Sequence, residues 1–236
     1  MSSLTRKFLS LLLWEFKLQL RYYFWIVGLV MTLVWFGILS LMPSELSALW
    51  VPVLLFVDTC TIGVLFVAGM LYLDRSQGTM DVIAVMPIAT STWILSRILS
   101  LSILCSVFAL IIILVRAESV VWVRAVPAVL LSSALYTSLG FLIACPFKKL
   151  MDYFLVMALT IALMNLPIFG YFEVFDSAFL WLLPTQPVMK VLAGSLGEMT
   201  TMDFTFAMGL LLVWLGVINF FCTKAFSVYV SQRMGA

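Results

Sequence analysis

Ionisable side chains are scarce in this sequence, and their types limit the chemistry that it could perform. The 236 residues include 13 Lys and Arg, 11 Asp and Glu, and no His. Most nucleophile–base triads, intramembrane zinc proteases and His proton relays use an imidazole, so the lack of His disfavours them. The Gly-x-Ser-x-Gly turn of a catalytic serine and the Gly-x-x-x-x-Gly-Lys-Ser/Thr phosphate loop are both missing. We therefore expect a chain that is not an enzyme and that binds no nucleotide, metal or other cofactor itself.

The carboxyl group that lies deepest in apolar sequence is that of Asp58, within Leu-Leu-Phe-Val-Asp-Thr-Cys-Thr. A charge at such a depth costs about 3 kcal/mol on insertion scales unless it faces protein or water. Two interpretations stay open. Asp58 could line an export path and meet polar or cationic substrate groups, or it could be protonated or hydrogen-bonded to a nearby hydroxyl or Asn. Asn165 and Asn219 are candidates for the same path, although such amides commonly bond one membrane helix to another.

The long polar segment between two apolar runs is residues 74–88, Asp-Arg-Ser-Gln-Gly-Thr-Met-Asp-Val-Ile-Ala-Val-Met-Pro-Ile. Residues 79–86 could form two helical turns. They begin next to Gly78, which permits an unusual backbone angle, and end before Pro87, which disfavours helix at the preceding residue. The segment is thus predicted to be a short helix on a loop.

The order of residues in this segment resembles the cytoplasmic coupling segment of ABC-2 type transporter permeases. That pattern runs Glu-Arg, two variable residues, Gly-Thr, a variable residue, Glu, then Leu-rich positions and a Pro. Arg75, Gly78 and Pro87 match it, whereas Asp74 and Asp81 stand where Glu is usual.

The resemblance implies that the segment docks on a separate ATPase and transmits its movement. Asp74 and Arg75 would pair with each other or with charges of the partner. Thr79 would cap the short helix, with Asp81 near its positive end. The apolar residues that would enter a groove on the ATPase are Val82, Ile83 and Val85.

Composition predicts an all-α membrane protein. Hydrophobic residues make up 64% of the chain, charged residues 10%, and the mean hydropathy is +1.20, whereas soluble domains are nearer half apolar. Because one span needs about 20 apolar residues, the chain has room for six spans in a single transmembrane domain, residues 1–236, and for no ATPase domain. The predicted spans are residues 22–42, 50–73, 93–115, 126–144, 153–172 and 204–226.

Two segments outside these spans have their own patterns. Residues 4–21 carry Leu and Phe at i, i+4 spacing and cations on another face, which predicts an amphipathic helix in the membrane interface. Residues 173–203 are too apolar for a free loop and too broken for a span, so a pair of short helices or a re-entrant segment on the outer side is predicted. Arg97, at the start of the third span, is expected to extend to the lipid headgroups. The four cysteines are interpreted as apolar packing residues.

The basic residues predict the orientation in the cell (inner, or cytoplasmic) membrane. Six spans place both termini on one side, and the positive-inside rule assigns that side to the cytoplasm. The net charge of +2 is too small to indicate a nucleic-acid partner. Ten basic residues lie on the side of the termini and of residues 74–88: Arg6, Lys7, Lys17, Arg21, Arg75, Arg97, Lys148, Lys149, Lys224 and Arg233. Three lie on the other side: Arg116, Arg124 and Lys190.

Taken together, the predicted elements resemble an ABC-2 permease of minimal length, the fold also called type V exporter-like. The resemblance implies a dimer with a second copy or a sibling permease, surrounded by lipid, and a partner ABC ATPase dimer that holds ATP and Mg. It implies export of a drug, an antibiotic or a lipid-like amphiphile. The segment Leu-Pro-Thr-Gln-Pro at residues 183–187 is similar to segments of permeases described as fluoroquinolone exporters.

Three alternatives remain at this point. A haem-export permease of the cytochrome c maturation type has a similar size, although the lack of His gives no support to haem ligation. A non-transporting membrane scaffold or immunity protein would need no ATPase. An intramembrane lipid-modifying enzyme would be active without ATP.

Overall fold

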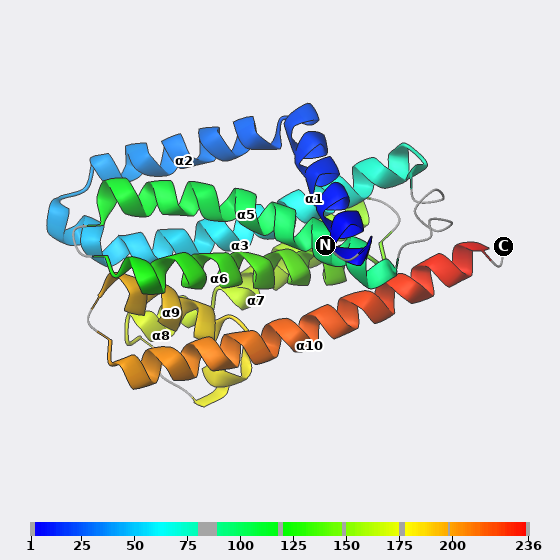
Figure 1. The fold of residues 1–236 in the computed structure, drawn as a ribbon. Coiled ribbons are helices and arrows are strands. Elements are labelled where there is room, and N and C mark those ends of the chain that lie inside the picture. Colours follow the sequence, from blue (N-terminus) through cyan, green and yellow to red (C-terminus); the bar gives the residue numbers. More distant parts are fainter. Residues whose placement is uncertain are drawn as a thin grey trace.

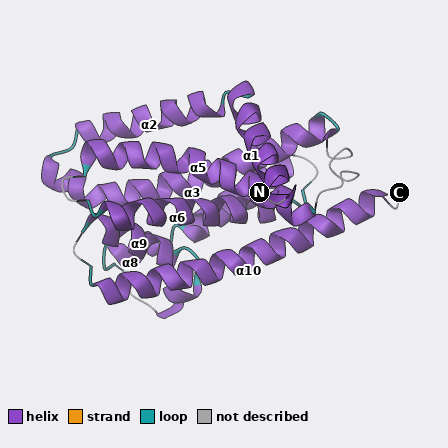
Figure 2. Ribbon diagram, viewed as in Figure 1, coloured by secondary structure: helices purple, strands orange, loops and turns teal. Residues whose placement is uncertain are grey.

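The computed structural model describes residues 3–79, 89–117, 120–147, 150–174, 178–197 and 199–234, and the regular structure of these residues is helical (Figure 2). The helices are α1 (Ser3–Arg21), α2 (Phe24–Ser40), α3 (Ser44–Ser76), α5 (Thr90–Arg116), α6 (Trp122–Ala144), α7 (Leu150–Met164), α8 (Pro167–Tyr171), the 3₁₀ helix η1 (Ala178–Leu182), α9 (Gln186–Leu196) and α10 (Thr201–Met234).

Five helical segments of the described chain are long and apolar enough to cross a membrane. They are α3, α5, α6, α10, and α7 continued by α8. α2 has 17 residues and is bent by 65° from α1, and these two helices count as a sixth span when they are taken together. The chain is thus a multi-pass, all-helical membrane protein with five to six candidate spans.

Several helices extend beyond the apolar limits that hydropathy marks. α3 begins at Ser44 and not near residue 50, so Pro52 lies inside the helix instead of in its first turn. α10 continues to Met234, well past the predicted limit of residue 226. Hydropathy identifies the part that suits lipid, whereas helical hydrogen bonding continues into polar residues wherever those find partners.

The core of the bundle is formed by α3, α5 and α6, which pack on one another, while α2 lies against α5 and α9 against α6 and α10 (Figure 1). α7 and α10 bury only a small part of their surface and form the outer layer. The start of α1, the end of α3 and the end of α10 lie toward the same end of the bundle (Figure 1). We call this the α1 end.

Glycine allows α3 and α6 to approach closely. A Cβ atom added to Gly140 on α6 would lie 2.7 Å from the Cα of Val64 on α3, and one added to Gly63 would lie 3.1 Å from the Cβ of Tyr136. Small residues at such positions let two membrane helices touch backbone to backbone. This contact fixes the centre of the bundle.

The many hydroxyl groups of α5 and α6 bond mainly within their own helices. Ser106 donates to the carbonyl of Ser102, and Ser133 to that of Val129, at 2.6 and 2.8 Å. Thr137 donates to the carbonyl of Ser133 at 2.7 Å. Among the residues that the structure describes, the hydroxyl contact across the α5–α6 interface is Ser106 to Ser133, at 3.4 Å. The buried surface between these helices is therefore largely apolar in its contacts despite its serine content.

Candidate functional site

A buried arginine joins three helices at the α1 end. The Arg97 guanidinium on α5 donates from Nη2 and Nε to the two carboxylate oxygens of Glu15 on α1, at 2.9 and 3.0 Å. Its Nη1 donates to Oδ2 of Asp74, which lies in the last turn of α3. The side chains of Arg97 and Glu15 are 1% and 2% exposed. Bidentate pairing of this kind fixes both the distance and the angle between the helices that carry it.

The expectation that Arg97 reaches the lipid headgroups was wrong. The side chain is buried because two carboxylates from other helices supply a balancing charge, and a buried guanidinium is tolerated only with such partners. The indole of Trp93 also lies beside it, with its ring centroid 4.7 Å from the Arg97 Cζ. Burial raises the pKa of Glu15, and the neighbouring Arg97 charge opposes that rise.

α1 attaches to the bundle through polar side chains. Besides Glu15, Gln19 is fully buried and donates from Nε2 to the Ser100 hydroxyl at 3.0 Å. Leu13 and Leu20, by contrast, are 62% and 61% exposed. Leu11 and Leu18 pack against the core, so the outer side of α1 leaves only part of its apolar surface uncovered by the protein, and an interfacial helix would place that part against lipid.

Asp74 and Arg75 take different partners. Whereas Asp74 pairs with Arg97, Arg75 donates to the backbone carbonyls of Cys145 and Phe147, the former at 2.6 Å. Those carbonyls belong to the turn that follows α6. Asp74 therefore connects the end of α3 to Arg97 on α5, and through it to α1. Arg75 connects the same end of α3 to the turn that follows α6.

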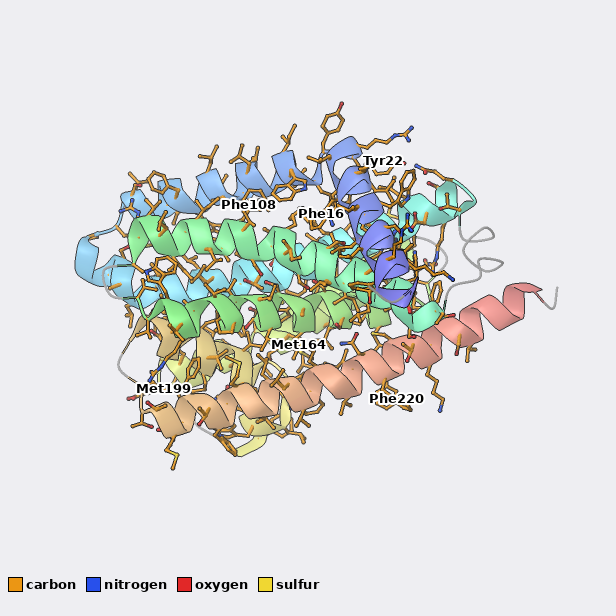
Figure 3. The ribbon with its side chains drawn as sticks, in the orientation of Figure 1. Phe16, Tyr22, Phe108, Met164, Met199 and Phe220 are labelled. Carbon is orange, nitrogen blue, oxygen red and sulfur yellow. The ribbon has the colours of Figure 1, made fainter. Side chains whose placement is uncertain are left out.

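The chain that leaves α3 is tied back to it. Gly78 has a φ of +69°, a left-handed conformation that glycine adopts without strain. Thr79 donates its hydroxyl to the backbone carbonyl of Asp74 at 2.9 Å. Gln77 donates to the hydroxyl of Tyr22, which Figure 3 shows near the junction of α1 and α2. The remaining predicted coupling residues, Asp81, Val82, Ile83, Val85 and Pro87, lie outside the described residues.

Asp58 is buried in α3, and Oδ1 accepts a hydrogen bond from the indole Nε1 of Trp35 on α2 at 2.6 Å. This partner is neither the hydroxyl nor the Asn that the sequence suggested. Asn165, just past α7, donates to the carbonyl of Ile161, and Asn219 on α10 donates to the Ser138 hydroxyl at 3.3 Å. Within the described residues, no hydrogen bond joins these three predicted path residues to one another.

Comparison with known proteins assigns the chain to a family. The family model of the fluoroquinolones export permease proteins matches residues 6–234. The chain belongs to this family. The permease is also 24% identical, over 189 residues, to the fluoroquinolones export permease proteins of two strains of Mycobacterium tuberculosis, CDC 1551 / Oshkosh and ATCC 25618 / H37Rv. In each case the match covers 79% of this chain and 79% of the relative. The predicted ABC-2 type permease for drug export is thereby confirmed.

Sequence reasoning singled out Asp74 and Arg75, which make the contacts described above, but it missed Glu15 and the partners of Arg97. A signal was present in α1, where Glu15 and Gln19 are four residues apart and lie between apolar neighbours such as Leu11 and Leu18. Two polar residues one turn apart on a helix share a face. That face could have been recognised as one that needs a buried partner.

Proposed function

We propose that this permease is the membrane subunit of an exporter driven by ATP that a separate ABC ATPase hydrolyses. Residues 74–88 would contact that ATPase, and this chain would supply no catalytic group, nucleotide site or metal. Both termini and the coupling segment would face the cytoplasm, and two permease subunits would assemble with two ATPase subunits in the cell membrane.

The contacts of Asp74 and Arg75 with the rest of the bundle carry this proposal. A force applied to residues 74–88 reaches α3 directly. It reaches α5 and α1 through the Arg97 ion pairs, and the turn after α6 through the carbonyl contacts of Arg75. Ion pairs and charge-assisted hydrogen bonds that are shielded from water transmit displacement because they are strong and directional.

The substrate class follows from the family. The relatives are named fluoroquinolones export permease proteins, and we propose that this permease exports fluoroquinolones or similar aromatic amphiphiles. The family match also favours drug export over the haem-export alternative.

The test combines assembly with transport. The tagged permease is extracted from its native membrane in mild detergent, and co-purifying ATPase is identified by mass spectrometry and assayed for ATP hydrolysis. Ile83→Asp should release the ATPase, because it would place a charge in the apolar contact. The matched control is Val123→Asp on α6, which changes an 87% exposed residue at the opposite end of the bundle.

Transport is then measured as ATP-dependent accumulation of a fluorescent fluoroquinolone in inside-out vesicles. Wild type and Val123→Asp should accumulate the drug, and Ile83→Asp should not. Absence of any ABC ATPase from the wild-type preparation, under conditions that keep other transporters assembled, would refute the coupling proposal.

A further inference from the structure

A pocket of about 330 Å³ lies at the α1 end, between α1 and the adjoining ends of α3 and α5. Its walls include the aromatic side chains of Trp14, Tyr22 and Trp93 and the aliphatic side chains of Leu11 and Leu18. The amphipathic helix α1 forms one side of the pocket, and a helix of this kind lies in the membrane interface, within reach of lipid headgroups.

The charged residues of the lining are two acids and two arginines, and three of them lie together at the polar side of the pocket. This side is formed by the Arg97 cluster, in which two carboxylates, Glu15 and Asp74, share one guanidinium. The side chain of Asp74 is 11% exposed, against 1% for Arg97 and 2% for Glu15, so Asp74 is the acid that a ligand can reach. Its Oδ2 is paired with Arg97 and its Oδ1 accepts a hydrogen bond from the Thr79 hydroxyl at 3.3 Å, but a carboxylate can accept about four hydrogen bonds, so Asp74 can still accept one from a cation in the pocket.

The rest of the lining selects among cations. Aromatic faces attract an ammonium group, and Trp14 and Tyr22 supply them in the lining, whereas the Trp93 ring already lies beside the Arg97 guanidinium. The remaining charged residue of the lining, Arg21, is exposed at the end of α1 and can meet an anion. Leu11 and Leu18 suit an alkyl chain. The lining therefore fits an amphiphile whose head carries an ammonium and an anionic group close together.

We propose that this pocket binds the headgroup of an aminophospholipid of the phosphatidylethanolamine type, with its ammonium donating to Asp74 and its phosphate beside Arg21. A primary ammonium carries N–H donors for the carboxylate, whereas the quaternary ammonium of phosphatidylcholine carries none. The bound lipid would hold α1 against α3 and α5. The proposal rests on the membrane location of the chain and does not depend on the identity of the ATPase or the drug.

The test measures which lipid stays bound. The full chain is purified in mild detergent, equilibrated with equal amounts of phosphatidylethanolamine, phosphatidylcholine and phosphatidylglycerol of identical acyl chains, and examined by native mass spectrometry. We expect retention of phosphatidylethanolamine over phosphatidylcholine by about tenfold, the order of one charge-assisted hydrogen bond. Equal retention of these two lipids, or preference for phosphatidylglycerol, would overturn the proposal.

Variants locate the bound lipid. Trp14→Ala and Arg21→Gln change exposed lining residues outside the ion-pair cluster, and each should reduce retention of phosphatidylethanolamine at least about threefold. Lys17→Gln, on the same helix but outside the lining, and Leu13→Ala, an exposed apolar change, are the matched controls and should retain the lipid as wild type does. Unchanged retention in both lining variants, with monodisperse elution of each, would place the lipid elsewhere and refute the assignment.

A soluble ligand of the same chemistry is tested in a separate arm. A fluoroquinolone is itself an aromatic zwitterion, so it is added in excess over the lipid. The lipid proposal predicts that phosphatidylethanolamine remains bound. Displacement of the lipid in wild type, together with drug binding that Trp14→Ala abolishes, would instead make the pocket a drug site and overturn the lipid assignment.

Discussion

Arg97 on α5 and Glu15 on α1 form two parallel hydrogen bonds, at 2.9 and 3.0 Å, although they are 82 positions apart in the chain. The pair attaches a peripheral helix to the core, and the same guanidinium also holds the end of α3 through Asp74. One side chain thus joins three helices at the α1 end.

Replacement of Arg97 should lower the stability of the protein, and the loss should be larger when more of its ion pairing is removed. Arg97→Leu leaves two buried carboxylates without a cation and should destabilise the protein by about 3–5 kcal/mol. Arg97→Lys keeps the charge but not the bidentate geometry, so its cost should be smaller. Thermal unfolding in detergent measures both, with Arg6→Gln at an exposed position of α1 as the control. Equal stability of Arg97→Leu and wild type would contradict the role given to this cluster.

Replacement of Arg75 should reduce drug transport more than it reduces binding of the ATPase. Arg75→Gln weakens the contacts with the carbonyls of Cys145 and Phe147, so motion of residues 74–88 should no longer reach the turn after α6. We expect the ATPase to co-purify as with wild type while drug transport falls at least about tenfold. Lys190→Gln, an exposed change on α9, is the control. Transport at the wild-type rate in Arg75→Gln would show that this connection is dispensable.

The α3–α6 contact should not tolerate a methyl group. In Gly140→Ala the new Cβ would lie 2.7 Å from the Cα of Val64, so the helices must separate, at a cost of about 1–3 kcal/mol. Gly209→Ala and Gly216→Ala on α10 are matched controls, because nothing lies within 4 Å of a Cβ at either position. There the better helix propensity of Ala should leave stability unchanged or raise it slightly. Chemical denaturation of the three variants separates these outcomes.

The hydrogen bond between Trp35 and Asp58 can be tested by a double-mutant cycle. Trp35→Phe removes the donor and should destabilise the wild-type protein by about 1–3 kcal/mol, because a buried carboxylate loses its partner. In an Asp58→Leu background the same change should cost clearly less. Asp58→Asn keeps an acceptor oxygen and should preserve folding. If Asp58→Asn folds but loses transport, the charge itself is used, as the export-path interpretation requires.

The sequence was sufficient to predict elements whose signal is local. Apolar runs marked the membrane helices, and the pattern from Asp74 to Pro87 marked the segment after α3. The partners of Arg97 could not be predicted in this way, because Glu15 and Asp74 meet it only after three helices have packed. The side chain of an arginine near the end of a span commonly extends to the lipid headgroups. Only the tertiary contacts show that Arg97 does not.

Asp58 illustrates the same limit. Its burial could be inferred from the surrounding apolar residues, but its partner could not, since a Trp in a membrane protein is commonly an interface anchor and nothing local marks Trp35 as the donor to Asp58. Asn219 bonds to Ser138 of another helix, as such amides commonly do, whereas Asn165 donates to the carbonyl of Ile161 in α7, next to it in the chain. Whether they share a substrate path stays a prediction.

The serines and threonines of α5 and α6 have a consequence for motion within the bundle. Each hydroxyl that donates to a carbonyl of its own helix keeps that bond when the helix shifts as a rigid rod. A shift of α5 along α6 would therefore leave these own-helix bonds intact, but it would break the contact between Ser106 and Ser133 and disturb the apolar packing, which includes the rings of Trp93 and Phe141. The serines thus add few polar cross-links between the two helices, so movement of α5 would be opposed mainly by side-chain packing and by the ion pairs of Arg97 at the α1 end.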